Sequence, residues 1–243
     1  MNNWMRAALA LTLLAAAGCG GAYGDGWGEP NAEPIDRQEV RLDFAPAPAD
    51  REPVRAGERL DEDADIVKEQ PAAGGTVQFY VKADEAEHVY AAFRTPQGFF
   101  DLGAIGGRQP LWDDETLFAA EVEAGGTKLL RTKGVYGANA PVQRYFAVAD
   151  GTVVSALRID VGHADEVDLD GDGAAEIVAS HGAPISTYIY KRENGSFLVA
   201  NLNDALRAES VRYVGGGTFE ASVAGDPKAA RYVYAGGALR PAE

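Results

Sequence analysis

The sequence predicts an all-β protein with one antiparallel domain over residues 71–243, either propeller-like or built as a curved sheet or sandwich, and one short helix. The first observation is the alternation of apolar and polar residues in several segments. This period of two is typical of strands that bury one face. We therefore expect strands over Thr76–Lys82, His88–Arg94 and Thr187–Lys191.

The second observation is the placement of turn residues between these segments. Asp150-Gly151 and Asn194-Gly195 each separate two apolar segments and suit two-residue type I′ hairpins, which require positive φ at both positions. Gly215-Gly216-Gly217 and Gly236-Gly237 mark two looser hairpins. Only 203–209, opened by Asn203 as a cap, reads as a helix. Similar strand–turn–strand units recur about every 40 residues, which is typical of propeller blades and leaves room for about four.

Composition excludes several classes of function. The chain has 243 residues, 22 Lys and Arg against 37 Asp and Glu, and a formal net charge of −15. A phosphate backbone would be repelled over most of such a surface, so we expect no nucleic-acid partner. The single cysteine excludes an intramolecular disulfide and a Cys-rich zinc site.

The first segment reads as a signal peptide over residues 1–18. Arg6 precedes an apolar run, 7–17, that is too short to cross a bilayer as a helix. The run ends in Ala16-Ala17-Gly18-Cys19, which resembles a bacterial lipobox with Ala16 in the usual leucine position. The resemblance implies cleavage before Cys19, lipidation of Cys19, and an extracytoplasmic protein held to the membrane of the cell envelope by lipid. Ordinary secretion with an incidental cysteine is the alternative.

Residues 19–70 read as a flexible acidic tether rich in Pro and Gly. Between 19 and 70 there are 14 acids and six bases, and few aliphatic side chains. Such a segment buries too little apolar area to offset its ordering entropy. Within it, 37–44 is a candidate for one added strand. The acidic run 61–65 is either a cation site or, as we favour, a solvated run.

One motif carries chemistry, the loop 168–176. Carboxylates stand at Asp168, Asp170, Asp172 and Glu176, and Gly173 allows a sharp turn. A tight loop brings alternate side chains to one concave side, where the carbonyl of Ala174 adds a further oxygen. Carboxylates brought this close repel one another unless a cation sits among them, and an oxygen-rich, flexible set favours Ca²⁺ over Mg²⁺ or Zn²⁺. The alternative is an acidic turn without an ion.

The same loop, with the strand-like residues after it, resembles the calcium loop of FG-GAP and VCBS repeats. The matching residues are Val-Asp-Leu-Asp-Gly-Asp-Gly from position 167, followed by Glu176-Ile-Val. The resemblance implies calcium ligands at Asp168, Asp170, Asp172, Glu176 and, by its carbonyl, Ala174. The chain departs from the family in ending the loop with Glu rather than Asp and in carrying the loop once.

Other candidate residues have structural explanations that we favour. His163 is either a base or metal ligand, or a hydrogen-bonded loop histidine. Ser180 and His181 are sequence neighbours without a nucleophile elbow. Trp112 either lines a carbohydrate or peptide surface or packs in the core.

Three functions fit these observations. The favoured one is a lipid-anchored, non-enzymatic calcium-binding module that binds a protein or polysaccharide of the envelope. A structural or sensory accessory of a membrane complex is the second. The third is an extracytoplasmic hydrolase, for example a carbohydrate-active one, with structural calcium and a separate carboxylate pair for catalysis.

Overall fold

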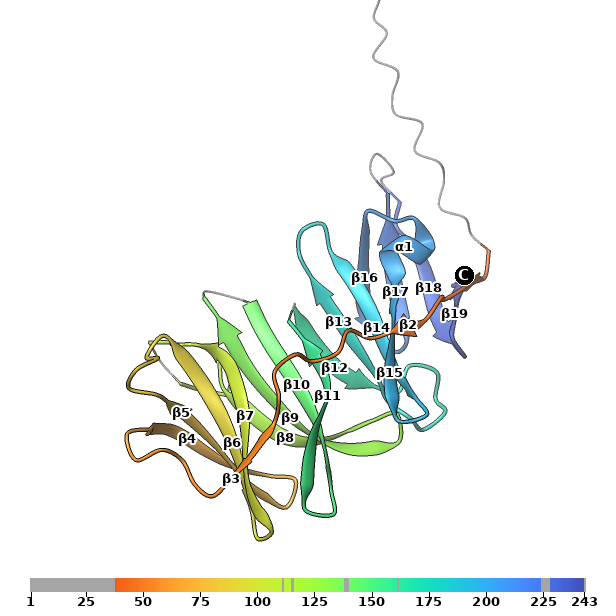
Figure 1. Cartoon of the computed structure of the whole chain (residues 1–243). Helices are drawn as coiled ribbons and strands as arrows, with labels where there is room; N and C mark the ends of the chain where they lie inside the picture. The colour runs from red at the N-terminus through yellow and green to blue at the C-terminus, as the bar shows by residue number, and fades with distance from the viewer. Residues whose placement is uncertain are drawn as a thin grey trace, which may run out of the picture. The chain divides into compact units, whose positions relative to one another are not determined.

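A computed structural model describes residues 38–110, 112–114, 116–137, 140–160, 162–223 and 228–242. The predicted signal peptide, Cys19 and the first part of the expected tether, 19–37, lie outside these residues. Among the described residues the strands form four antiparallel sheets, and one short helix is present (Figure 1). The all-β prediction is confirmed.

Each sheet is a meander of four consecutive strands. The first sheet contains β4 (Asp65–Ala72), β5 (Gly75–Val81), β6 (His88–Thr95) and β7 (Gly98–Gly107). The second contains β8 (Phe118–Ala124), β9 (Thr127–Tyr136), β10 (Ala140–Ala149) and β11 (Thr152–Ile159). The third contains β12 (His163–Val167), β13 (Glu176–His181), β14 (Ser186–Glu193) and β15 (Ser196–Asn201). The fourth contains β16 (Ser210–Gly215), β17 (Thr218–Ser222), β18 (Ala230–Ala235) and β19 (Ala238–Pro241).

Local chemistry explains the hairpins and the helix. Asp150 and Gly151 have φ of 50° and 71°, and Asn194 and Gly195 have φ of 50° and 81°, as a type I′ turn requires. The helix α1 (Leu202–Leu206) starts one residue before the predicted segment 203–209 and ends three residues before the end of that segment. Its cap is Asn201, not Asn203: the Asn201 side chain accepts hydrogen bonds from the N–H groups of residues 203 and 204.

Three hydrophobic clusters join successive sheets. One cluster lies between the first and second sheets, one between the second and third, and one between the third and fourth beneath α1. Successive side chains of β10 point to opposite faces of the second sheet and so belong to different clusters. Tyr145 packs toward the third sheet and Phe146 toward the first. In the fourth sheet the opposite face is polar instead: Glu220 lies between Arg212 and Arg231 and forms ion pairs with both. This charged face suits solvent, not a further sheet.

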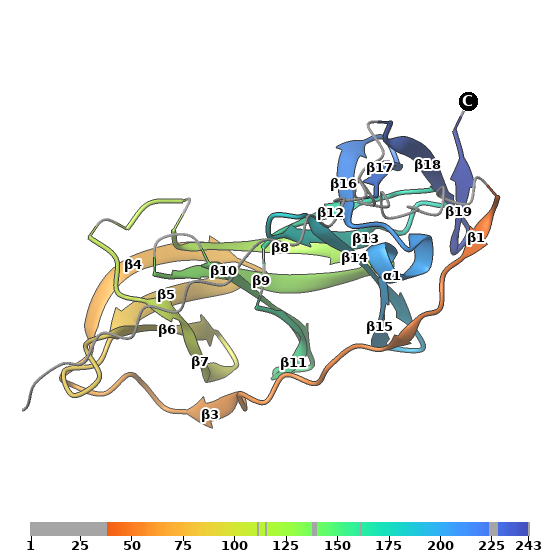
Figure 2. The ribbon, with the colours of Figure 1, turned by 90° about the horizontal axis from the view of Figure 1, so that it is seen from above.

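The segment 38–57, here called the strap, corrects the predicted domain boundary. It carries β1 (Val40–Arg41), β2 (Ala45–Pro46) and β3 (Arg55–Gly57). These pair with the last strands of three sheets, β19, β15 and β7 respectively. Figures 1 and 2 show the strap passing along the sheets in the order opposite to the chain. The tether prediction is therefore wrong from residue 38 onward, and the domain does not begin at residue 71. The predicted strand within 37–44 is present as β1.

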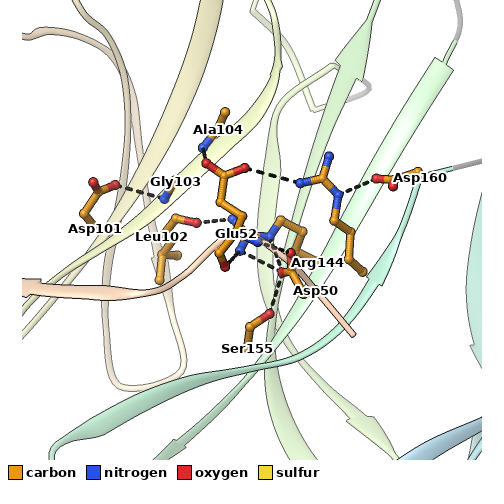
Figure 3. Close-up of polar contacts among 10 residues, drawn as sticks. Asp50, Glu52, Asp101, Leu102, Gly103, Ala104, Arg144, Ser155 and Asp160 are labelled. Atoms are coloured by element: carbon orange, nitrogen blue, oxygen red, sulfur yellow. Dashed lines mark hydrogen bonds and ion pairs between the residues drawn. The ribbon is translucent and has the colours of Figure 1, made fainter. Parts of the chain in front are cut away.

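The second sheet holds the strap by side chains rather than by a strand. The guanidinium of Arg144 in β10 donates to Asp50 Oδ2, with Nε 2.8 Å away, and the hydroxyl of Ser155 in β11 donates to the same oxygen over 2.5 Å (Figure 3). Arg144 also donates to the carbonyls of Leu102 and Glu52. The side chains of Arg144 and Asp50 are 0% and 2% exposed. A buried ion pair, whose two members make further hydrogen bonds to Ser155, Leu102 and Glu52, therefore fixes the middle of the strap.

Paired edges have a physical advantage. An unpaired last strand presents free N–H and C=O groups that invite pairing with another chain. The strap covers part of this edge on three sheets, although it contributes only two or three residues to each. The low apolar content of the strap does not prevent order, because strand pairing satisfies part of its backbone and the buried Asp50–Arg144 ion pair holds its middle.

Candidate functional site

The predicted calcium loop is the connection between β12 and β13. The register closes the hairpin with Val167 opposite Glu176, which leaves 168–175 as the loop. Leu169 is 5% exposed and belongs to the cluster between the third and fourth sheets. The buried Leu169 side chain thus anchors the loop. The carboxylates of its neighbours Asp168 and Asp170 are not part of this apolar cluster and lie close to each other.

Three predicted ligands come together. Asp168, Asp170 and Glu176 each offer a carboxylate oxygen, and these oxygens all lie within 4.8 Å of one another. Among the described residues this is the one such cluster of acidic, histidine or cysteine side chains that could hold a metal ion. The acidic run 61–65 forms no comparable group.

Backbone amides orient these carboxylates. Asp168 accepts hydrogen bonds from the N–H groups of Gly171 and Gly173, over 2.8 and 3.0 Å. Both glycines have positive φ, 77° and 88°, so the loop turns back on its first residue. Glu176 accepts from the N–H of Leu169 over 3.1 Å. The sequence spacing therefore produces the predicted concave loop.

Asp170 links the loop to the fourth sheet. Its Oδ2 accepts a hydrogen bond from the N–H of Gly236, in the β18–β19 turn, over 2.9 Å. Its Oδ1 is buried and has no hydrogen-bond partner among the described residues. A buried carboxylate oxygen without a donor is costly. A cation bound beside Glu176 and Asp168 would satisfy it, so the donor set fits a metal ion.

The electrostatics point in the same direction. Burial, reinforced by the charges of Asp170 and Asp172, raises the pKa of Glu176 to about 7. Glu176 is only 8% exposed, and its neighbours disfavour a further negative charge. Burial, and then the charges of Glu176, Asp170 and Asp172, also raise the pKa of Tyr234, in β18. The ion-free loop thus concentrates more negative charge than its surroundings stabilise.

Two predicted ligands lie differently. The Asp172 carboxylate accepts a hydrogen bond from the N–H of Ala174 over 2.7 Å and is not part of the three-residue cluster. Ala174 is thereby held by its N–H, and the ligand role of its carbonyl stays a prediction. A rotation of the exposed Asp172 side chain would be needed to bring it to the cluster.

Neighbouring sheets hold the loop on two sides. The N–H of Gly125, in the β8–β9 turn, donates to the carbonyl of Ala175 over 2.8 Å. Gly217, in the β16–β17 turn, lies so close that a Cβ there would be 2.3 Å from the Leu169 carbonyl oxygen. The loop is therefore a junction of the second, third and fourth sheets, which no motif in the sequence indicated.

The other candidate residues have structural partners. Ser180 shares a hydrogen bond with Thr187 over 2.8 Å, and the His181 ring stacks on Tyr188. His163 starts β12 opposite Ser180 and is exposed. Trp112 packs against the cluster between the first and second sheets, as the core interpretation expected.

No helix among the described residues is long and apolar enough to span a membrane. Comparison of the chain with protein-family models, with curated proteins and with solved structures found no match.

Proposed function

We propose that this chain is a calcium-stabilised β module, held outside a bacterial membrane by lipid on Cys19, that binds a protein or polysaccharide of the cell envelope without catalysing a reaction. The observation that carries the calcium part is the convergence of Asp168, Asp170 and Glu176 within 4.8 Å. The unpartnered Oδ1 of Asp170 supports it. The membrane part rests on the sequence around Cys19.

Calcium is the metal that this donor set suits best. All three side chains offer hard oxygen atoms, and no histidine or cysteine belongs to the cluster. Ca²⁺ takes six to eight oxygen ligands in flexible geometry, so loop carbonyls and water complete the coordination. In this proposal the ion neutralises the loop and thereby secures the junction of three sheets.

Calcium should raise the melting temperature of the wild-type protein by about 3–5 °C relative to chelator. Extracellular calcium sites have Kd of about 10⁻⁴ M or weaker, and at roughly 1 mM Ca²⁺ this adds about 1.4 kcal/mol to the folded state. For a domain of this size that corresponds to a few degrees. Differential scanning calorimetry with Ca²⁺ and with EDTA measures the shift.

Two variants make the calcium experiment specific. Asp170→Asn keeps an acceptor for the Gly236 N–H but removes the charge, so it should abolish the calcium-dependent shift. Asp165→Asn changes an exposed carboxylate in β12, outside the cluster, and should retain the shift. Equal melting curves for the wild type with Ca²⁺ and with EDTA would show that the loop is an acidic turn without an ion.

The anchor is tested separately. Mass spectrometry of the mature protein from the native membrane should find an N-terminal Cys19 carrying lipid. Cys19→Ala should give an unprocessed or soluble protein, because both the cleavage signal and the attachment atom are lost. A mature chain with an unmodified Cys19, released into the medium, contradicts the anchor and leaves the calcium experiment untouched.

A further inference from the structure

A cavity of about 520 Å³ lies where the strap crosses the third sheet, beside α1. Binding cavities for small molecules span about 300–1,000 Å³, so its size suits a ligand of one or a few rings. Its lining combines residues of the strap, among them Arg41 and Asp43, with Tyr188, Tyr190, Asn201 and Asp204.

The floor of the cavity is a patch of one sheet face. Tyr188 pairs with Asn201 and Tyr190 with Val199, as direct cross-strand neighbours of β14 and β15. Val199 pairs in turn with Ala45 of β2, so the strap extends the same face. Tyr188 and Tyr190 are two residues apart and point to the same side. The half-buried Tyr188 is the accessible ring of this aromatic platform, Tyr190 forms its buried base, and Val199 with Ala45 forms an aliphatic edge.

The platform is held in place. The His181 ring, from β13, stacks on the Tyr188 ring with centroids 5.7 Å apart and planes 7° from parallel. Tyr190 is 8% exposed and packs in the cluster between the second and third sheets. Both rings are therefore oriented before any ligand arrives, which lowers the entropic cost of binding.

The rim of the cavity is polar and of mixed charge. Arg41 and Asp43 are exposed, and neither side chain has a hydrogen-bond or ion-pair partner among the described residues. The lining also contains Asn201 and Asp204, whose side chains are hydrogen bonded to each other. Guanidinium, carboxylate and amide groups thus surround an apolar floor.

We propose that this cavity binds a neutral pyranose unit of an envelope polysaccharide. The apolar face of a pyranose packs on aromatic rings, while its hydroxyls donate to carboxylates and accept from guanidinium and amide groups. An anionic sugar is disfavoured, because the lining holds the two carboxylates of Asp43 and Asp204 against the one guanidinium of Arg41, and the whole chain carries −15. This inference rests on the proposed binding function and names its ligand class.

Ligand-observed saturation-transfer NMR tests the proposal with the full folded chain. The probes are four neutral tetrasaccharides (maltotetraose, cellotetraose, mannotetraose and tetra-N-acetylchitotetraose), with oligoproline as a peptide probe for the same aromatic platform. We expect at least one sugar to receive saturation with a Kd of about 10⁻³ M, the range for one or two ring units on an open site. No transfer to any of the four sugars, or transfer to oligoproline alone, overturns the proposal.

Variants assign the signal to the cavity. Tyr188→Ala should weaken the sugar at least about tenfold, and Asp43→Ala or Arg41→Ala several-fold, since each removes part of the floor or rim. Tyr213→Ala, a half-buried tyrosine of the fourth sheet, is the matched control and should bind like the wild type. Where Tyr188→Ala lowers stability, the exposed Asp43 and Arg41 variants decide. Unchanged affinity in these two variants contradicts the site.

The calcium experiment separates this inference from the function on which it rests. A calcium-dependent melting shift without sugar binding removes the pyranose site and keeps the calcium module. Sugar binding that is equal in Ca²⁺ and EDTA, together with no melting shift, keeps the pyranose site and removes the calcium module.

Discussion

Asp50→Ala should lower the free energy of unfolding by about 3–5 kcal/mol, because it leaves the buried Arg144 charged without its partner. Arg144 is fully buried. Asp50 Oδ2 accepts hydrogen bonds from the Arg144 guanidinium and from the Ser155 hydroxyl. Because the Arg144 side chain is 0% exposed, water cannot take the place of the lost carboxylate. Loss of the strap from the second sheet then follows, since no backbone pairing holds it there. Urea denaturation measures the change.

Two further variants show whether the effect belongs to this ion pair. Arg144→Met combined with Asp50→Ala should cost less than the sum of the single changes, because each single change leaves one member of the pair alone. Asp43→Ala, an exposed residue of the same strap, should stay within about 0.5 kcal/mol of the wild type. A cost below about 1 kcal/mol for Asp50→Ala contradicts the buried-pair argument.

Lowering the pH should weaken the same ion pair between Asp50 and Arg144. Burial opposes ionisation of Asp50, yet the hydrogen bonds from Ser155 and the Glu52 N–H and the charge of Arg144 outweigh it, so the pKa of Asp50 is lowered. A lowered folded-state pKa gives stability that is present above the unfolded value of about 3.9 and is lost as pH falls through the folded value.

These contacts of the strap could not be predicted from the sequence. The strap reads as a tether because it is acidic and rich in Pro, and composition alone cannot distinguish a solvated carboxylate from one with a distant partner. Asp50 lies 94 residues from Arg144, and Glu39 lies 201 residues from its partner Arg240. Each strap strand is two or three residues long, too short to show any period. Such order depends on tertiary pairing, which local pattern does not encode.

Local features were predictable for the opposite reason. The positive φ values at Asp150-Gly151 and Asn194-Gly195 follow from residue type and position alone. The loop 168–176 is likewise local, because its glycines and the hydrogen bonds that they donate to Asp168 all lie within nine consecutive residues. The partner of Asp170 is not, because Gly236 lies 66 residues away. The spacing also predicted Asp172 as a ligand. In the structure its carboxylate instead accepts a hydrogen bond from the nearby Ala174 N–H.

In chelator, the wild-type protein should become less stable as pH rises from about 5 to 8, and calcium at roughly 1 mM should recover about half of this loss. The raised pKa of Glu176, about 7, means that the folded state holds a proton more tightly than the unfolded chain, where the pKa is about 4.3. Its contribution is therefore fully present below the unfolded value and is lost as pH rises through about 7. Between pH 5 and pH 8 this corresponds to a loss on the order of 2–3 kcal/mol.

Bound calcium reverses the effect that ionisation of Glu176 has on the stability of the folded state. A bound cation stabilises the ionised Glu176, so protons and Ca²⁺ compete for the same carboxylate. With a pKa of about 7, the apparent calcium affinity at pH 5.5 should be roughly 30-fold weaker than at pH 8. The calcium-dependent melting shift should accordingly be small at pH 5.5 and largest at pH 8. Calorimetric scans at both pH values, each with Ca²⁺ and with EDTA, measure this.

Glu176→Gln isolates the residue responsible. Glutamine keeps an acceptor for the Leu169 N–H and cannot ionise, so in EDTA at pH 8 this variant should be more stable than the wild type. Its melting temperature in EDTA should vary less between pH 5 and 8, and its calcium response should be weak at both. Asp165→Asn, exposed and outside the cluster, should keep the wild-type pH profile. If Glu176→Gln in EDTA at pH 8 is less stable than the wild type, the buried Glu176 carboxylate is not strained by its charge, and the pH argument for the calcium loop fails.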